Sequence, residues 1–248
     1  MGLLGIGFAL LIWSAAANAR DTNIAAASSL NYVLPDIAAT YKIKTGRPLK
    51  LIFGSSRSLV HQILAGAPFE LFLSADRESV RILGAKSFTE GPEIVYGRGR
   101  LALFLAESAR VKFSPDLKFP MDRADLAKIH RFAIANPKIA PYGQIAREAL
   151  HAAGVWAMFK DKLVVGQNAM QTAQFAASGS VDAALIPYAL ALDPRFAVRG
   201  RSVLVSEELY HPLDQSMVLI RGAGQEARAF FSFLQSDYAK SRFEETGL

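Results

Sequence analysis

The 248-residue chain contains no cysteine. This absence excludes disulfide bonds, thiolate metal sites and the lipid-bearing N-terminal cysteine of membrane-tethered exported proteins. Histidine is scarce as well, and none of the four histidines stands in a recognisable metal-ligand pair or beside a nucleophile motif. Glycine-rich phosphate loops are also missing. The sequence therefore predicts that the protein is not an enzyme, and an enzyme of unrecognised mechanism is kept only as a remote alternative.

Charged residues are missing from the start of the chain. Residues 1–19 contain no Asp, Glu, Lys or Arg, and their central apolar run is too short to span a bilayer as a helix. The segment ends in Ala17-Asn18-Ala19, a small-x-small pattern that signal peptidase accepts. We therefore expect a secretory signal peptide over residues 1–19, cleaved near Ala19, and a periplasmic mature protein that begins at Arg20. The alternative is a buried N-terminal core helix.

Blocks of basic residues are absent too, although the chain carries a formal net charge of +6. This charge favours encounter with anions through the summed field of the protein. The Lys and Arg residues are scattered singly and do not alternate with aromatic residues, which gives little support to a nucleic-acid surface. We expect an anionic partner, no nucleic acid and a monomer.

The residues that are present predict an α/β fold. Hydrophobic side chains make up 51% of the chain, which is enough for a large core. Short apolar strands alternate with helical patterns, as in parallel βαβ units. Pro35 conflicts with this pattern, because it falls in the second turn of the helix expected after the first strand and would remove a backbone donor there. The predicted strands are 23–27, 49–53, 70–73, 131–135, 162–165 and 181–186.

No segment is typical of a flexible linker, so a domain boundary must be formed by strands that cross directly between lobes. Two long extended stretches, residues 94–105 and 212–220, fit this role, and the helix expected at 225–235 would return to the first lobe. Two crossover strands of this kind form a hinge. The predicted parts are a discontinuous lobe 1 (20–98 and 212–248) and a lobe 2 (99–211).

Four loops follow strands and open helices, at residues 25–30, 53–59, 135–143 and 165–170. Each helix start presents unpaired backbone N–H groups at the positive end of the helix dipole. Because α/β sheets gather such loops at the carboxyl ends of their strands, the four could form an anion site without any formal positive charge. Tyr188, directly after the strand at 181–186, adds a hydroxyl. The alternative is that the serines only cap their own helices.

These segments resemble the periplasmic molybdate-binding proteins of ABC transporters, which have the type II solute-binding fold. The resemblance extends over nearly the whole mature chain. It implies a protein without a cofactor that captures molybdate or tungstate between its lobes, as an oxyanion without direct protein–metal bonds, and delivers it to a membrane permease. The matching pieces are Ala26-Ala27-Ser28-Ser29-Leu30, Phe53-Gly54-Ser55-Ser56, residues 66–76 (GAPFELFLSAD), Ala135-Asn136-Pro137, Ala140-Pro141-Tyr142-Gly143, residues 166–171 (GQNAMQ) and Ile186-Pro187-Tyr188.

The resemblance also implies which residues hold the oxyanion. Ser29 and Ser56 match serines that give a hydroxyl and a backbone N–H. Tyr142 and Met170 match positions that give a backbone N–H only, and Tyr188 matches a tyrosine that gives its hydroxyl. We expect Ser29 and Ser56 to come from one lobe and the other three from the second.

Two departures from the family pattern leave questions open. Tyr142 stands where other members have Ala, which keeps the N–H donor but could reshape the pocket wall. Arg57 replaces a small residue, and it either strengthens anion capture at the cleft mouth or points to solvent. The main alternative ligands for the same fold are sulfate and phosphate. A ferric complex fits less well because it needs anionic or phenolate oxygens, and a regulatory sensing domain conflicts with export.

Overall fold

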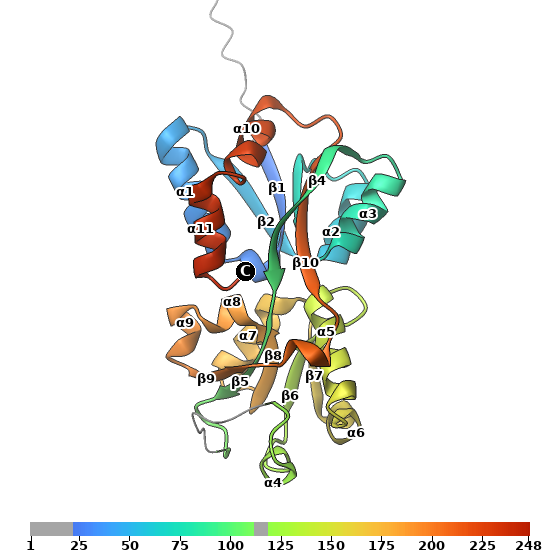
Figure 1. Ribbon diagram of the computed structural model, residues 1–248, viewed down its shortest axis with the longest axis vertical. Coiled ribbons are helices and arrows are strands. Elements are labelled where there is room, and N and C mark those ends of the chain that lie inside the picture. The colour runs from blue at the N-terminus through green and yellow to red at the C-terminus, as the bar shows by residue number, and fades with distance from the viewer. Residues whose placement is uncertain (1–21, 112–118) are drawn as a thin grey trace, which may run out of the picture.

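The computed structural model describes residues 22–111 and 119–248. The predicted signal peptide, residues 1–19, and the predicted mature terminus at Arg20 lie outside these ranges. Figure 1 shows two α/β lobes stacked along the long axis of the molecule and joined by β-strands. Within the described ranges, no helix combines the length and the apolar character needed to cross a bilayer.

The first lobe is built on a five-stranded sheet with the order β2-β1-β3-β10-β4. Strand β1 pairs in parallel with β2 and β3, whereas β10 is antiparallel to both β3 and β4. The strands are β1 (Thr22–Ala27), β2 (Leu49–Gly54), β3 (Leu71–Ser74), β4 (Thr89–Gly99) and β10 (Leu213–Ile220). The helices are the 3₁₀ turn η1 (Ser28–Leu30), α1 (Val33–Thr45), α2 (Ser56–Leu64), α3 (Arg77–Ala85), α10 (Gln225–Phe233) and α11 (Asp237–Glu245).

The second lobe repeats this plan in the order β7-β6-β8-β5-β9. Strand β6 is parallel to β7 and β8, and β5 is antiparallel to β8 and β9. The strands are β5 (Leu101–Ala106), β6 (Phe132–Ala135), β7 (Leu163–Gly166), β8 (Ala183–Pro187) and β9 (Gly200–Leu204). The helices are α4 (Arg123–Leu126), α5 (Pro141–Ala152), α6 (Trp156–Phe159), η2 (Lys160–Lys162), α7 (Ala169–Ala177), α8 (Tyr188–Ala191), α9 (Pro194–Ala197) and η3 (Glu207–Leu209).

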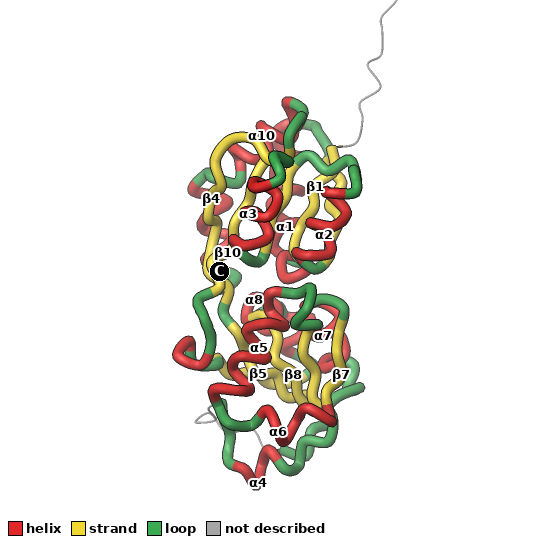
Figure 2. The backbone as a smooth tube through the Cα atoms, turned by 90° about the vertical axis from the view of Figure 1, so that its right-hand side faces the viewer, coloured by secondary structure: helices red, strands yellow, loops and turns green. Residues whose placement is uncertain are grey.

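The chain passes between the lobes through strands, and Figure 2 shows these strands at one edge of the molecule. Only Arg100 separates β4 of the first sheet from β5 of the second, so the stretch predicted at 94–105 is two strands and not one. The chain returns from the second lobe to the first between η3 and β10. The predicted α/β fold with two lobes is confirmed.

Side chains alternate between the two faces of the first sheet, as the pleat of a strand requires. On β1, Ile24 and Ala26 pack under α1, α10 and α11, whereas Ala25 packs under α2 and α3. On β3, Leu71 and Leu73 lie on the first of these faces. Each face is thus covered by helices, and the carboxyl ends of the parallel strands are left to face the other lobe.

The first helix begins later than the sequence pattern indicated. A 3₁₀ turn occupies Ser28–Leu30, and α1 starts only at Val33. The expected position of Pro35 in a second helical turn was therefore wrong, because Pro35 lies in the first turn of α1. There its missing N–H has no intrahelical acceptor to lose. Helix α1 ends at Thr45, and Gly46 caps it with a φ of 72°, the left-handed conformation that glycine adopts readily.

Candidate functional site

A small cavity lies where the two lobes meet. It offers about 10 Å³ to the centre of a water-sized sphere, which is close to the space needed by one water molecule. The lobes are therefore closed against one another in this structure. No charged side chain occurs among the described residues that line the cavity, which are Ala27, Ser28, Ser29, Gly54, Ser55, Ser56, Ala75, Ala140, Pro141, Tyr142 and Ala169.

The first wall is the turn that follows β1. Strand β1 lies between β2 and β3 and ends at Ala27, so the two serines that follow it emerge at the carboxyl edge of the sheet. Ser29 is 3% exposed, and its hydroxyl has no hydrogen-bond partner among the described residues. Ser28 is also buried, and its Oγ accepts the N–H of Met170 from the other lobe at 3.4 Å. A buried hydroxyl without a partner is costly, and because Ser29 lines the cavity its hydroxyl is available to a ligand there.

The second wall is the start of α2, directly after β2. Ser56 is 1% exposed, and its Oγ accepts the N–H of Ala75 at 3.0 Å. That bond occupies the oxygen and leaves the hydroxyl proton free to be donated. Ser55 donates its own proton to Ser58 Oγ at 2.7 Å. Ser56 is therefore the serine of this wall that can donate into the cavity.

The second lobe contributes the starts of α5 and α7. Pro141 is the first residue of α5, and the N–H of Tyr142 in the next position has no acceptor within the helix. Helix α7 begins at Ala169 after Asn168, whose side chain accepts the N–H of Gln171 at 2.9 Å. With α2 from the first lobe, three helices thus direct their positive ends at one small cavity.

The structure brings together three of the five residues predicted from the sequence, since Ser29, Ser56 and Tyr142 all line the cavity. For the fourth, Met170, the lining residue is its neighbour Ala169. The amide of Met170 still points across the cleft to Ser28. Ser28 and Ala169 were not singled out from the sequence, because a sequence does not show which of two adjacent residues at a helix start faces the cleft.

The fifth predicted residue, Tyr188, is not among the described residues that line the cavity. Its N–H donates to the carbonyl of Arg100 at 2.8 Å, and the Arg100 guanidinium lies 4.9 Å from the centre of its ring. A Cβ on Gly247 would come within 2.9 Å of that ring. Tyr188 therefore packs beside the crossover strand, and its role as a ligand stays a prediction.

Arg57, the other open question, is turned away from the cavity. Its guanidinium forms an ion pair with Glu78 at 2.7 Å, and both side chains are partly exposed. Its backbone N–H donates across the cleft to the carbonyl of Ile139 at 3.2 Å. Arg57 thus contributes to lobe contact through its backbone, while its charge is balanced by a carboxylate of its own lobe.

A buried hydrogen bond links the lobes behind the cavity. Gln215, on β10, donates from Nε2 to the hydroxyl of Tyr142 at 2.9 Å and accepts with Oε1 from Tyr96 at 2.8 Å. A Cβ on Gly99 would lie 2.5 Å from both Gln215 Nε2 and the Tyr142 oxygen, so the bond requires glycine there. Burial raises the pKa of Tyr142 above its ordinary value, and the phenol stays neutral at physiological pH.

The polar groups that line the cavity suit a deprotonated anion, which accepts hydrogen bonds and donates none. Hydroxyl and amide donors are present, and carboxylate and imidazole groups are absent from the described lining. In the described ranges, no group of three or more His, Asp or Glu side chains could hold a metal ion. The arrangement therefore suits an anion held by neutral donors, each bond worth about 1.5–3 kcal/mol to a charged partner.

Comparison with known proteins places the chain in a family. A family model described as bacterial extracellular solute-binding protein matches residues 22–248. The molybdate-binding protein ModA of Rhodobacter capsulatus is 33% identical over 234 residues, which are 92% of this chain and 89% of that protein. ModA of Azotobacter vinelandii is 30% identical over 222 residues, or 88% and 84% of the two chains. The structure of the periplasmic molybdate-binding protein of Azotobacter vinelandii, 24% identical, has a TM-score of 0.82 over 92% of this chain and 98% of that chain. The chain belongs to the family of bacterial extracellular solute-binding proteins.

Proposed function

We propose that this protein binds molybdate or tungstate between its lobes and passes the oxyanion to the membrane permease of an ABC transporter. The observation that carries the proposal is the Ser29 hydroxyl, which is buried at the cavity without a partner among the described residues. An unsatisfied buried hydroxyl costs about 1–3 kcal/mol, and an oxyanion at this place would remove that cost. The names of the curated relatives support molybdate as the ligand.

The proposed donors come from both lobes, so the anion is fully surrounded only when the lobes close. Ser29 and Ser56 would give hydroxyl groups, and Tyr142 and Met170 would give backbone N–H groups. A tetrahedral oxyanion is larger than one water molecule, so its entry would move the lobes slightly apart and break the 3.4 Å contact between Met170 N and Ser28 Oγ. The hydroxyl of Tyr188 remains the fifth proposed donor, and titration of Tyr188→Phe would decide its part.

The described lining of the cavity contains no carboxylate or imidazole that could accept a proton from the ligand, and this bears on the choice of anion. Phosphate still carries a proton for part of its population near neutral pH and needs an acceptor for it. Molybdate, tungstate and sulfate are fully deprotonated and only accept hydrogen bonds. A cavity without a carboxylate acceptor therefore favours these three over phosphate, and size would separate sulfate from the two larger anions.

Isothermal titration of the mature chain with molybdate, tungstate, sulfate and phosphate tests this function. We expect molybdate and tungstate to bind with similar affinities and sulfate and phosphate to bind at least about a hundredfold more weakly, a difference of about 2.7 kcal/mol. Sulfate or phosphate that bound as tightly as molybdate would overturn the proposed ligand.

The remaining sequence predictions belong to this proposal. We infer export to the periplasm with cleavage near Ala19, and action as a monomer. The lobe boundaries stay as predicted, with residues 20–98 and 212–248 in lobe 1 and 99–211 in lobe 2. They are supported by the positions of β4 and β10 in the first sheet and of β5 in the second.

Arg57→Ala is expected to change molybdate affinity by less than about threefold at physiological salt, because its exposed ion pair is screened and lies away from the cavity. Its effect should appear in the association rate and grow as the ionic strength falls. Calorimetry and binding kinetics at two salt concentrations measure both quantities. A loss of affinity beyond tenfold at high salt would show that the guanidinium contacts the anion.

A further inference from the structure

Tyr32, three residues after Ser29, reaches out of its own lobe. It lies between η1 and α1 of the first lobe, yet its ring packs against a hydrophobic cluster of the second lobe that includes Met170 and Phe196. The Tyr32 and Phe196 ring centres are 5.7 Å apart. Tyr32 follows the turn that carries Ser29, and its aromatic ring is therefore packed into the opposite lobe.

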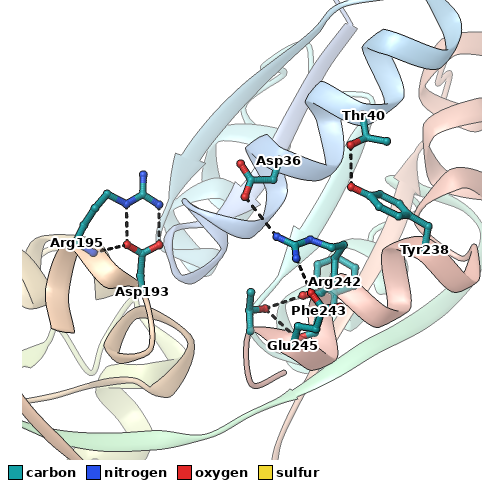
Figure 3. Close-up of polar contacts among 9 residues, drawn as sticks. Asp36, Thr40, Asp193, Arg195, Tyr238, Arg242, Phe243 and Glu245 are labelled. Carbon is teal, nitrogen blue, oxygen red and sulfur yellow. Dashed lines mark hydrogen bonds and ion pairs between the residues drawn. The ribbon is translucent and has the colours of Figure 1, made fainter.

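The guanidinium group of Arg195 covers the ring of Tyr32. The guanidinium carbon of Arg195, on α9, lies 3.3 Å from the centre of the Tyr32 ring, within the range of a cation–π contact. Arg195 is held in place by Asp193, which accepts from Nε and from Nη2, each at 2.7 Å, as Figure 3 shows. Arg195 lowers the pKa of the Asp193 carboxyl, so the pair stays ionised near neutral pH. The guanidinium is thus held by its own lobe in the position where Tyr32 meets it when the lobes close.

A pocket of about 210 Å³ beside this contact is also formed by both lobes. Ser29, Tyr32 and Asp36 line it from the first lobe, and Asp193 and Pro194 line it from the second. Arg242 lies on the first-lobe side, 3.6 Å from Asp36 (Figure 3). Since Ser29 borders both this pocket and the anion cavity, the Tyr32 contact closes the cleft immediately next to the proposed ligand.

We propose that Tyr32 and Arg195 form a latch that holds the two lobes closed over the anion. The inference rests on the proposed function. Opening the lobes separates Tyr32 from Arg195 and Phe196, so the contact stabilises the closed state only. Tight binding requires the closed state, and the apparent dissociation constant varies inversely with the closed fraction. Tyr32 and Arg195 are positioning residues, because neither lines the anion cavity among its described residues.

Calorimetric titration with molybdate tests the latch. Tyr32→Ala is expected to weaken binding roughly tenfold or more, and Arg195→Met roughly three- to tenfold, the range expected for loss of one cation–π contact. Tyr32→Phe keeps the ring and should bind like the parent. Small-angle scattering at saturating molybdate should show less compaction for Tyr32→Ala than for the parent.

The chain offers a matched control inside one lobe. Lys44 lies over the rings of Phe233 and Tyr238 at 5.4 and 5.5 Å, and all three belong to the first lobe. Lys44→Met removes both of these cation–π contacts without touching the cleft, so molybdate affinity should not change. Arg195 is largely exposed, and Arg195→Met should fold even if Tyr32→Ala does not.

The outcomes separate the latch from the proposed function. If the parent binds molybdate and both Tyr32→Ala and Arg195→Met bind it with the same affinity, the latch is wrong and the proposed function stands. If Lys44→Met weakens binding as much as Arg195→Met, the effect is general to the fold and the latch is again wrong. If the parent binds none of the four anions, the proposed function fails and the latch with it.

Discussion

Ser29→Ala is expected to weaken molybdate binding by about ten- to a hundredfold and to leave the ligand-free protein as stable as the parent or more stable. The hydroxyl has no partner among the described residues, so its removal from the free protein takes away an unsatisfied buried group. In the complex the same change removes a donor to a desolvated dianion, worth about 1.5–3 kcal/mol. Calorimetric titration and urea unfolding measure the two effects separately.

The chain contains a second buried hydroxyl of the same kind. Ser79, in α3, is fully buried, and its Oγ also lacks a partner among the described residues, but it does not line the cavity. Ser79→Ala should therefore be as stable as the parent or more stable, like Ser29→Ala. Unlike Ser29→Ala, it should bind molybdate as tightly as the parent. Ser56→Ala should lose both affinity and stability, because its Oγ also accepts the Ala75 N–H. Equal affinity of Ser29→Ala and the parent would rule out Ser29 as a donor.

Gly143→Ala is expected to have the largest effect of the single changes on folding and to weaken binding as well. A Cβ at this position would lie 2.1 Å from the carbonyl oxygen of Ala135, a backbone atom at the end of β6. The start of α5 would have to move away from the sheet, at a cost of about 1–3 kcal/mol or more. The N–H of Tyr142 moves with it, so molybdate affinity should fall at least about tenfold as well.

Gly84→Ala is the matched control for that change. Gly84 lies in the last turn of α3, and a Cβ there would meet only Thr89 Oγ1 at 3.6 Å, an ordinary contact. Alanine is favoured over glycine in a helix by up to about 1 kcal/mol, so this variant should be as stable as the parent or slightly more stable and bind like the parent. Urea unfolding of both variants gives the comparison. A Gly143→Ala protein with the stability of the parent would contradict the predicted backbone clash.

Strand positions could be predicted from the sequence because buried parallel strands are short, apolar and bounded by loop residues. All six predicted strands are present within two residues of their expected ends. The break at Arg100 could not be predicted, because an extended chain that changes sheets keeps the same local pattern. Helix α11 was not expected, since its polar composition gives only a weak apolar stripe, with Ala239 and Phe243 as its buried residues.

The candidate site could also be predicted only in part. Loops after strands were identifiable from serine and proline at helix starts, and Ser29, Ser56 and Tyr142 do line the cavity. The sequence did not show which hydroxyl and amide groups point into the cavity. The 3₁₀ turn at Ser28–Leu30 places Ser28 opposite the Met170 amide, and the place of Tyr188 beside Arg100 depends on packing between distant segments.

The strand order of the first sheet also fixes the order in which the protein can be completed. Strand β10 lies between β3 and β4, although more than a hundred residues of sequence separate it from both. While the chain is being synthesised, β3 and β4 therefore have no shared partner until the second lobe has already been made. The second sheet needs no strand from beyond β9, so it can form first. A nascent chain of this protein thus keeps its first lobe unfinished until late in synthesis, because β10 is among the last parts of the chain to be made.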